Sequence, residues 1–238
     1  MTISRLTFSN GALPDGRRAR RKVELQERIL RAALELFERQ GFFATTVEQV
    51  TEAADVGKGT FFNYFPSKEH VLAGFGDMQL AKVQAAVVEA EDERRRARDV
   101  LEKLIYALGE EPGRSQALVR SLLVANLSSE SVRKLLRGKL ARGQKLLAQI
   151  IAQGQRRGEI DAERRAANLA RAFQQTFIGT LLLWAIFPPS NLKDWLAPAF
   201  DVFWSGVSAR VRIARPDRRH RRKTRSSGGA RNGGKNDV

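Results

Sequence analysis

The 238-residue sequence predicts an all-α fold, and three features of the sequence support this prediction. Apolar residues recur every three to four positions along most of the chain, which is the spacing of one face of an α-helix. We find no convincing alternation of apolar and polar residues of the kind that is typical of a half-buried strand. Glycine and proline interrupt the periodic segments, so the chain divides into a series of helices.

The first periodic segment begins near residue 23 and ends at Gly41, a residue type that often follows the last turn of a helix. Its apolar stripe consists of Leu25, Ile29, Ala32, Ala33, Leu36 and Phe37. A short helix is expected after the cap candidates Thr45 and Thr46, because Gln49 lies three positions after Thr46, the spacing of a capping box. Gly57 separates that helix from a second short one.

The second short helix is predicted over 59–65, and Pro66 and Ser67 separate it from a long helix. Five further helices are predicted near 99–109, 115–127, 130–156, 162–187 and 192–212. Pro198 lies inside the last of these. Either that helix therefore begins near Asp194 with the proline in its first turn, or it bends at the proline.

The net charge of +16 is concentrated at the two ends of the chain. Residues 1–22 hold six Arg or Lys and one Asp, a net charge of +5, and residues 209–238 hold eleven and two, a net charge of +9. Residues 23–208 therefore carry only +2. The segment from Arg215 onward is rich in Arg, Ser, Gly and Asn, which is typical of a disordered tail.

Composition argues against several kinds of site and location. There is no cysteine, and the only histidines are His70 and His220, so neither a metal site nor a disulfide is expected. The longest apolar run, Phe177 to Phe187, is shorter than the roughly 20 residues that span a bilayer. The N-terminus lacks an apolar stretch of signal-peptide length. We expect a cytoplasmic protein with no membrane contact.

Residues 45–72, TTVEQVTEAADVGKGTFFNYFPSKEHVL, have the pattern of a helix-turn-helix, in which two short helices flank a turn that contains glycine. In the second helix, Phe61 and Phe65 are four positions apart and are expected to pack in the core. Its other residues are mainly polar or aromatic, and a helix of this kind fits the major groove of DNA. The segment therefore indicates sequence-specific binding of double-stranded DNA.

Residues 23–72 resemble the N-terminal domain of the tetracycline-repressor (TetR) family, most clearly in GKGTFFNYFPSKE over 57–69. Gly158-Glu159-Ile160-Asp161 also resembles the family's turn before its last two helices. The residues expected to contact DNA are Thr45, Thr46, Lys58, Gly59, Thr60, Phe62, Asn63, Tyr64 and Lys68. Phe62 departs from the family pattern, in which tyrosine is commonest, so a hydroxyl contact to phosphate is lost there. Lys68 is expected to pair with phosphate.

The resemblance implies a three-helix DNA-binding domain over 23–69 and a helical ligand-binding and dimerisation domain over 70–214. Residues 1–22 are expected to form a disordered basic arm and 215–238 a disordered basic tail. Within the arm, Arg20, Arg21 and Lys22 could reach DNA as arms of some DNA-binding folds do, or they could simply be solvated.

The resemblance also implies a homodimer in which the last two helices of each subunit form a four-helix bundle. The expected interface residues are Leu181, Trp184, Phe200, Phe203, Trp204 and Val207. The operator of such a dimer should be palindromic, and a small-molecule effector should release the protein from it. Phe173 and Phe177 are candidates for the effector pocket, and core packing is the alternative role for both.

No catalytic residue and no cofactor is expected, because the phosphate-binding loop, nucleophile-elbow and zinc-protease motifs are all missing. The leading hypothesis is therefore a ligand-responsive repressor. An activator or a ligand-independent regulator is the alternative within the same class. From other classes, we retain a nucleoid-associated protein that binds DNA through its basic ends, and a helical enzyme whose only polar cluster would be Gln174, Gln175 and Thr176.

Overall fold

The computed structural model of the chain describes residues 16–209, so the expected basic tail and most of the expected arm lie outside the described residues. Within this range the chain forms nine α-helices and no strand, which confirms the predicted all-α fold. The helices are α1 (Arg17–Gln40), α2 (Val47–Ala53), α3 (Lys58–Tyr64), α4 (Lys68–Glu91), α5 (Ala97–Gly109), α6 (Gln116–Ser128), α7 (Glu130–Arg156), α8 (Ala166–Ile186) and α9 (Leu192–Val207), with a 3₁₀ turn η1 (Pro112–Arg114) before α6. None of the helices in the described range is long and apolar enough to cross a membrane.

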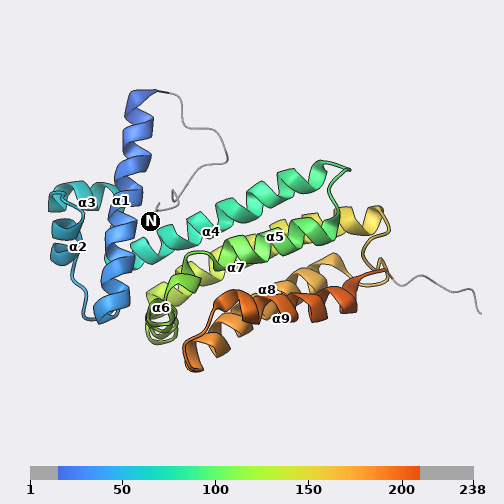
Figure 1. Cartoon of the computed structure of the whole chain (residues 1–238). Helices are drawn as coiled ribbons and strands as arrows, with labels where there is room; N and C mark the ends of the chain where they lie inside the picture. The colour runs from blue at the N-terminus through green and yellow to red at the C-terminus, as the bar shows by residue number, and fades with distance from the viewer. Residues whose placement is uncertain (1–15, 210–238) are drawn as a thin grey trace, which may run out of the picture.

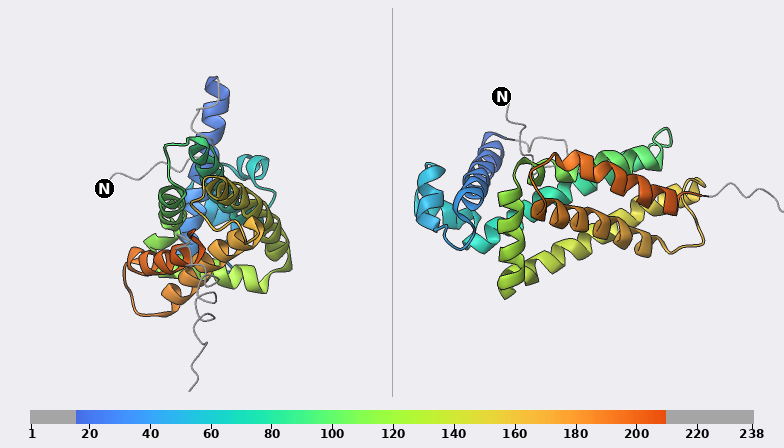
Figure 2. Two further views of the ribbon diagram at one scale, coloured as in Figure 1. Left: turned by 90° about the vertical axis from the view of Figure 1, so that its right-hand side faces the viewer. Right: turned by 60° about the horizontal axis from the view of Figure 1, so that its bottom comes forward.

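Helices α1, α2 and α3 form a small unit at one end of an elongated molecule (Figure 1). Helix α4 leads from this unit into a bundle formed by α4 to α9, and both further views show the same division (Figure 2). In the bundle α4 packs on α7, α7 on α8, and α8 on α9, while α5 contacts α4, α7 and α9. The unit at the end is not isolated, because α1 also packs against α6.

The apolar stripe of α1 forms the core of the small unit. Ile29, Leu30, Ala33 and Phe37 are completely buried and pack with Phe61 of α3. Helix α1 ends where expected, because Gly41 has a φ of 85°, a value that glycine adopts at no steric cost. The same core includes Leu118 and Ala125 of α6, so the two expected domains share buried surface.

The start of α1 corrects the expectation of disorder for residues 17–22, the described helical part of the predicted arm. The helix begins at Arg17, so residues 17–22 form its first turns and continue the helix that carries the apolar stripe. Arg17, Arg18, Arg20, Arg21 and Lys22 are all exposed on these turns. The basic cluster is therefore held on a helix. The packed segment has already nucleated the helix, and each residue added to it gains one backbone hydrogen bond.

The turn at Gly158 joins three helix ends on the far side of the bundle. Gly158 has a φ of 72°, and Glu159 follows it with its carboxylate accepting a hydrogen bond from the backbone N–H of Ala97, at the start of α5. Arg157 donates to the carboxylate of Glu159 and to the carbonyl of Ala90, at the end of α4. The backbone of 159–161 pairs with that of 207–209 after α9.

Helix α9 includes Pro198 in its interior and begins at Leu192, so the helix does not begin near Asp194 with the proline in its first turn. It ends at Val207, five residues before the predicted end, because the backbone after it turns to pair with the Gly158 turn. Residues 210–212 of the prediction lie outside the described residues. The predicted helix over 130–156 is confirmed at both ends.

Candidate nucleic-acid interface and ligand cavity

Helix α2 begins with the capping box that the sequence predicted. The hydroxyl of Thr46 accepts a hydrogen bond from the backbone N–H of Gln49 at 3.2 Å, and the Gln49 side chain accepts from the N–H of Thr46 at 2.9 Å. Gln49 also accepts a hydrogen bond from Gln40 at the end of α1. These contacts set the direction in which α2 leaves α1, and they keep Thr46 exposed at the surface.

Helix α3 presents one exposed face that contains most of the residues expected to contact DNA. Lys58, Gly59, Phe62 and Asn63 are exposed, and they fall on one side because they are spaced by one and four positions. Thr60 and Tyr64 lie at the border of this face and are half-buried. On the opposite side Phe61 and Phe65 are buried, with ring centres 5.9 Å apart. Packing of these two phenylalanines therefore turns the polar side outward.

Thr45 is a correction to the expected set. Its side chain is 0% exposed, and its hydroxyl donates a hydrogen bond to the carbonyl of Gly41 at 2.8 Å. A threonine that closes the loop after α1 in this way cannot touch a DNA backbone. The sequence pattern could not distinguish the two neighbouring threonines, because both precede α2 and both are good caps.

Lys68 is also placed differently from the expectation of a phosphate contact. Its ammonium donates hydrogen bonds to the backbone carbonyls of Phe42, Phe43 and Thr45, at 3.0, 3.2 and 2.9 Å. An ammonium has three donors, so these carbonyls use all of them. Lys68 is the first residue of α4, where the positive end of the helix dipole disfavours a cation. The carbonyl oxygens offset this effect by lying against the ammonium. Lys68 therefore holds the loop before α2.

Lys58 forms an exposed ion pair with Glu48 of α2, with 2.6 Å between the ammonium nitrogen and a carboxylate oxygen. Lys58 holds the pKa of Glu48 below its ordinary value of 4.5, chiefly by a hydrogen bond to the carboxylate. An exposed pair of this kind contributes little to stability. The Lys58 ammonium can therefore exchange the carboxylate for a phosphate at low cost.

The basic residues Arg20, Arg21 and Lys22 lie on the first turns of α1, which project beyond the α2–α3 pair (Figures 1 and 2). Phe43 is an exposed residue near the same interface that sequence reasoning missed, with 56% of its surface accessible. The sequence feature that could have identified Phe43 is the pair Phe42-Phe43. A single side chain is enough to close the core at this loop, and Phe42 occupies that place.

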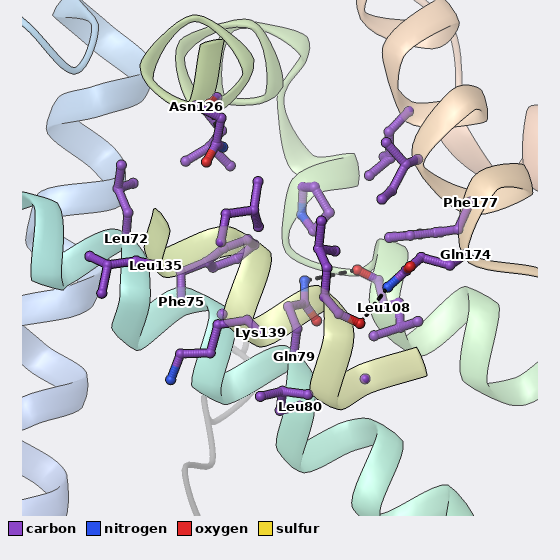
Figure 3. A pocket seen from close by; sticks show the side chains of 18 of the residues that line it. Leu72, Phe75, Gln79, Leu80, Leu108, Asn126, Leu135, Lys139, Gln174 and Phe177 are labelled. Carbon is purple, nitrogen blue, oxygen red and sulfur yellow. Dashed lines mark hydrogen bonds between the residues drawn. The ribbon is translucent and has the colours of Figure 1, made fainter. Parts of the chain in front are cut away.

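A cavity of about 250 Å³ lies between α4, α6, α7 and α8 in the bundle, and the end of α5 closes one side of it (Figure 3). Most of its lining is apolar and comes from leucine and phenylalanine side chains. Phe173 and Phe177, the two candidates from the sequence, both line it from α8. Phe173 is buried in the core at the same time, so the two roles weighed for it are compatible.

Three neutral amides are the main polar groups of the cavity wall. The Gln79 amide nitrogen donates to the carbonyl of Leu108, and that of Gln174 donates to the carbonyl of Leu140 (Figure 3). The amide nitrogen of Asn126 donates to the carbonyl of Leu122. Sequence reasoning singled out Gln174 only as part of a catalytic alternative and did not single out Gln79 or Asn126. Their neighbours in the sequence do not reveal that they share a cavity, because they come from three different helices.

The residues expected at a dimer interface are largely core residues of the subunit. Trp184, Phe200 and Val207 are buried, and Phe203 is only 8% exposed, while Leu181 and Trp204 are half-buried against the same core. The exposed apolar side chains on these two helices and the residue after α8 are Ile178, Leu182, Leu183, Ile186, Phe187 and Val202. We call this set the α8–α9 outer face. Most of the residues predicted for an interface therefore face the core of the subunit, and the sequence did not distinguish the two sides of α8 because both are apolar.

Within the described residues, no three histidine, aspartate or glutamate side chains are grouped as a metal site requires. The grouped polar residues are instead those of the α3 face and of the cavity. The residues of the α3 face point outward next to an ion-pairing lysine, whereas the cavity is partly open and its lining is mostly apolar. The two sites are joined by α4, which begins at Lys68 and passes Gln79 along the cavity wall.

Comparison with known proteins relates the chain to bacterial regulators. Residues 29–74 match the family model described as bacterial regulatory proteins, tetR family. The transcriptional repressor KstR of Mycobacterium tuberculosis is 26% identical over 165 residues, which cover 68% of this chain and 71% of that protein. The regulator TcmR of Streptomyces glaucescens is 48% identical over 56 residues, 24% of this chain and 25% of that protein. Among solved structures, the repressor FadR of Thermus thermophilus in complex with lauroyl-CoA is similar, with a TM-score of 0.56, 29% identity, and coverage of 76% of this chain and 94% of that chain.

Proposed function

The chain belongs to the tetR family of bacterial DNA-binding transcriptional regulators, and from this premise we propose that it is a homodimeric repressor that an apolar small molecule releases from a palindromic operator. The family and the relatives above are regulators and not enzymes. The proposal divides the chain into a DNA-binding domain over 23–69 and a ligand-binding and dimerisation domain over 70–214.

We assign base reading to the exposed face of α3. Asn63 has an amide that suits the edge of adenine, and Phe62 offers an apolar surface to a thymine methyl group. Lys58 and the exposed Thr46 lie beside them and supply the backbone contacts, and Arg20, Arg21 and Lys22 extend these contacts along α1. Gly59 supports this assignment, since a Cβ built there would meet nothing within 4 Å and the helix surface is open at that point.

The α8–α9 outer face is proposed to be the dimer interface. It places several large apolar side chains at the surface of a single subunit, and Ile186 is 67% exposed. Pairing of the two helices with their copies would bury these side chains in a four-helix bundle with two-fold symmetry. Two recognition helices related by that symmetry would meet DNA about one turn apart, roughly 34–36 Å, so the operator would be a palindrome.

Helix α4 contacts both the DNA-binding unit and the cavity, and this observation is the main support for a small-molecule effector. Its first residue, Lys68, holds the loop before α2, and its later turns form a wall of the cavity. A ligand that shifts α4 would therefore move the α2–α3 unit and change the spacing of the two recognition helices. Such a ligand acts only if it binds the shifted state more tightly. FadR was solved in complex with lauroyl-CoA, and the apolar acyl chain of that molecule supports an apolar ligand for this cavity.

A footprint of the purified protein on the DNA upstream of its own gene tests the proposal. We expect protection of a palindrome, and a gel-shift titration should show far weaker binding to random DNA of the same length. Addition of 1-decanol, a neutral molecule with an apolar chain of the kind that lauroyl-CoA carries, is the first effector probe. Equal affinity for the palindrome and for random DNA at every salt concentration would contradict the proposal and favour a nucleoid-associated protein.

A further inference from the structure

We propose that the ligand of the cavity is a neutral, apolar molecule that bears a hydroxyl group, and that this group donates its hydrogen to an amide oxygen of the wall, that of Gln79 or that of Gln174. This inference rests on the proposed function, because it names the chemical class of the effector. Three properties of the cavity support it: its size, the orientation of its amides, and the polar partners of its two charged side chains.

The size of the cavity limits the ligand to a small molecule or to a short part of a longer one. An engineered apolar protein cavity of about 150 Å³ admits benzene. If each non-hydrogen atom takes the same volume as a benzene carbon in that cavity, the 250 Å³ of this cavity accommodates about ten non-hydrogen atoms. Leucine and phenylalanine side chains dominate the wall, so most of those atoms must be carbon.

The amides present oxygen atoms as their free ends. The nitrogen of Gln79 lies 3.1 Å from the carbonyl oxygen of Leu108, and that of Gln174 lies 3.1 Å from the carbonyl oxygen of Leu140. Rotation of either amide by half a turn would bring two acceptor oxygens together, so both orientations are fixed. Asn126 repeats the pattern, with its nitrogen 2.7 Å from the carbonyl oxygen of Leu122.

The oxygen of Gln79 is buried and has no hydrogen-bond partner among the described residues. A buried acceptor without a donor is costly, and its cost is removed when a ligand supplies the donor. A hydroxyl group supplies such a donor with the fewest additional polar atoms. The apolar remainder of the molecule then fills the leucine-lined space.

The two charged residues of the wall already have polar partners. Lys139 forms an ion pair with Asp77, and the Glu69 carboxylate accepts a hydrogen bond from the hydroxyl of Ser67 at 2.6 Å. A carboxylate ligand would therefore enter an apolar space without a free cation to compensate for its lost hydration. The lining thus disfavours an anionic ligand and accepts a neutral one.

Calorimetric titration of the DNA-free protein with three small probes tests this inference. The probes para-butylphenol and para-propylanisole are isomers of equal size, and only the phenol can donate a hydrogen bond. The third probe, para-propylbenzoate, is an anion at neutral pH, since carboxylic acids ionise at a pKa of about 4, whereas a phenol has a pKa of about 10 and stays neutral. We expect the phenol to bind about tenfold more tightly than the anisole, with the benzoate the weakest of the three.

The variant Gln79→Met/Gln174→Met removes both acceptors and retains side chains of similar length. We expect the preference for the phenol over the anisole to fall from about tenfold to about twofold or less. Gln84→Met is the matched control, because Gln84 lies on the same helix outside the cavity lining, and it should retain the preference. If the double variant does not fold, the ranking of the three probes by the wild-type protein still decides the class of ligand.

Equal binding of the phenol and the anisole by the wild-type protein would overturn the inference, and so would tighter binding of the benzoate. A preference that survives in the folded double variant would overturn the assignment to the two amides. A gel shift with operator DNA, performed in parallel, separates these failures from a failure of the proposed function. A protein that binds operator but distinguishes none of the probes contradicts only the ligand class, whereas one that binds no DNA selectively contradicts the proposed function itself.

Discussion

The ammonium of Lys68 lies 4.7 Å from the centre of the Phe42 ring, across the junction between the start of α4 and the end of α1. The same ammonium donates hydrogen bonds to the backbone carbonyls of the loop that leads into α2. Phe42 is buried against Phe37, with ring centres 5.2 Å apart, so Lys68 is held against the core of the small unit. The helix that passes the cavity is therefore tied directly to the loop that positions α2 and α3.

Substitution of Lys68 by methionine should destabilise the DNA-binding unit. The change removes three charge-assisted hydrogen bonds and leaves the loop carbonyls without their donor, so we expect a loss of about 1–3 kcal/mol in the free energy of unfolding. Thermal denaturation followed by circular dichroism measures the change. Lys103→Met is the matched control, since Lys103 is exposed and pairs only with Glu89 at the surface. An unchanged melting temperature, together with a lower salt dependence of DNA binding, would instead support a direct phosphate contact.

Substitution of Asn63 by alanine should weaken operator binding and leave the fold intact. Asn63 is exposed on α3 and makes no contribution to the buried core, so helicity and melting temperature should not change. Loss of a base contact should cost about 1–3 kcal/mol of binding free energy, and binding to random DNA should change little. Gel-shift titration measures both affinities. Asn168→Ala, at an exposed asparagine of α8, should bind operator like the wild-type protein.

Glutamate substitutions on the two sides of the α8–α9 pair should have different consequences. Ile186→Glu places a charge on the α8–α9 outer face and should yield a folded monomer that binds the operator poorly. Phe203→Glu places a charge in the core, where Phe203 packs on Phe173, and should prevent folding. Light scattering and circular dichroism distinguish a monomer from an unfolded chain. Leu127→Glu, at a 73% exposed residue of α6, should remain dimeric, and a dimeric Ile186→Glu protein would move the interface elsewhere.

Substitution of Lys58 by glutamine should raise the pKa of Glu48 toward its ordinary value of 4.5, because the hydrogen bond from Lys58 is the main cause of the lowered pKa. A lowered pKa in the folded state stabilises the protein at higher pH. That contribution is lost as the pH falls through the folded pKa of Glu48, so the ion pair has no effect in strong acid. Carbon-detected NMR titration of the Glu48 carboxyl group measures the shift. Lys103→Gln should leave the pKa of Glu48 unchanged, and the same pKa in the Lys58 variant and the wild-type protein would contradict the role of the pair.

Local signals in the sequence were sufficient for the fold class, the order of the helices and the helix-turn-helix. Each depends on residues that are close in the chain: the apolar period of α1, the Thr46–Gln49 capping box and the spacing of Phe61 and Phe65. Helix and turn formation depend mainly on such neighbours, so their positions follow from the sequence to within a few residues. The helical start of α1 at Arg17 was missed, because a run of basic residues gives no periodic signal.

Packing between distant segments decided which faces are buried and which side chains meet. The same apolar character suits both sides of α8, and only the contacts with α6, α7 and α9 leave Ile186 exposed and bury Trp184. Lys68 meets carbonyls about 25 residues earlier in the chain, and Gln79 meets Leu108 across 29 residues. Neither contact can be predicted from the local sequence pattern. Helical periodicity describes each helix alone, whereas the partners of a side chain depend on how the helices pack against one another.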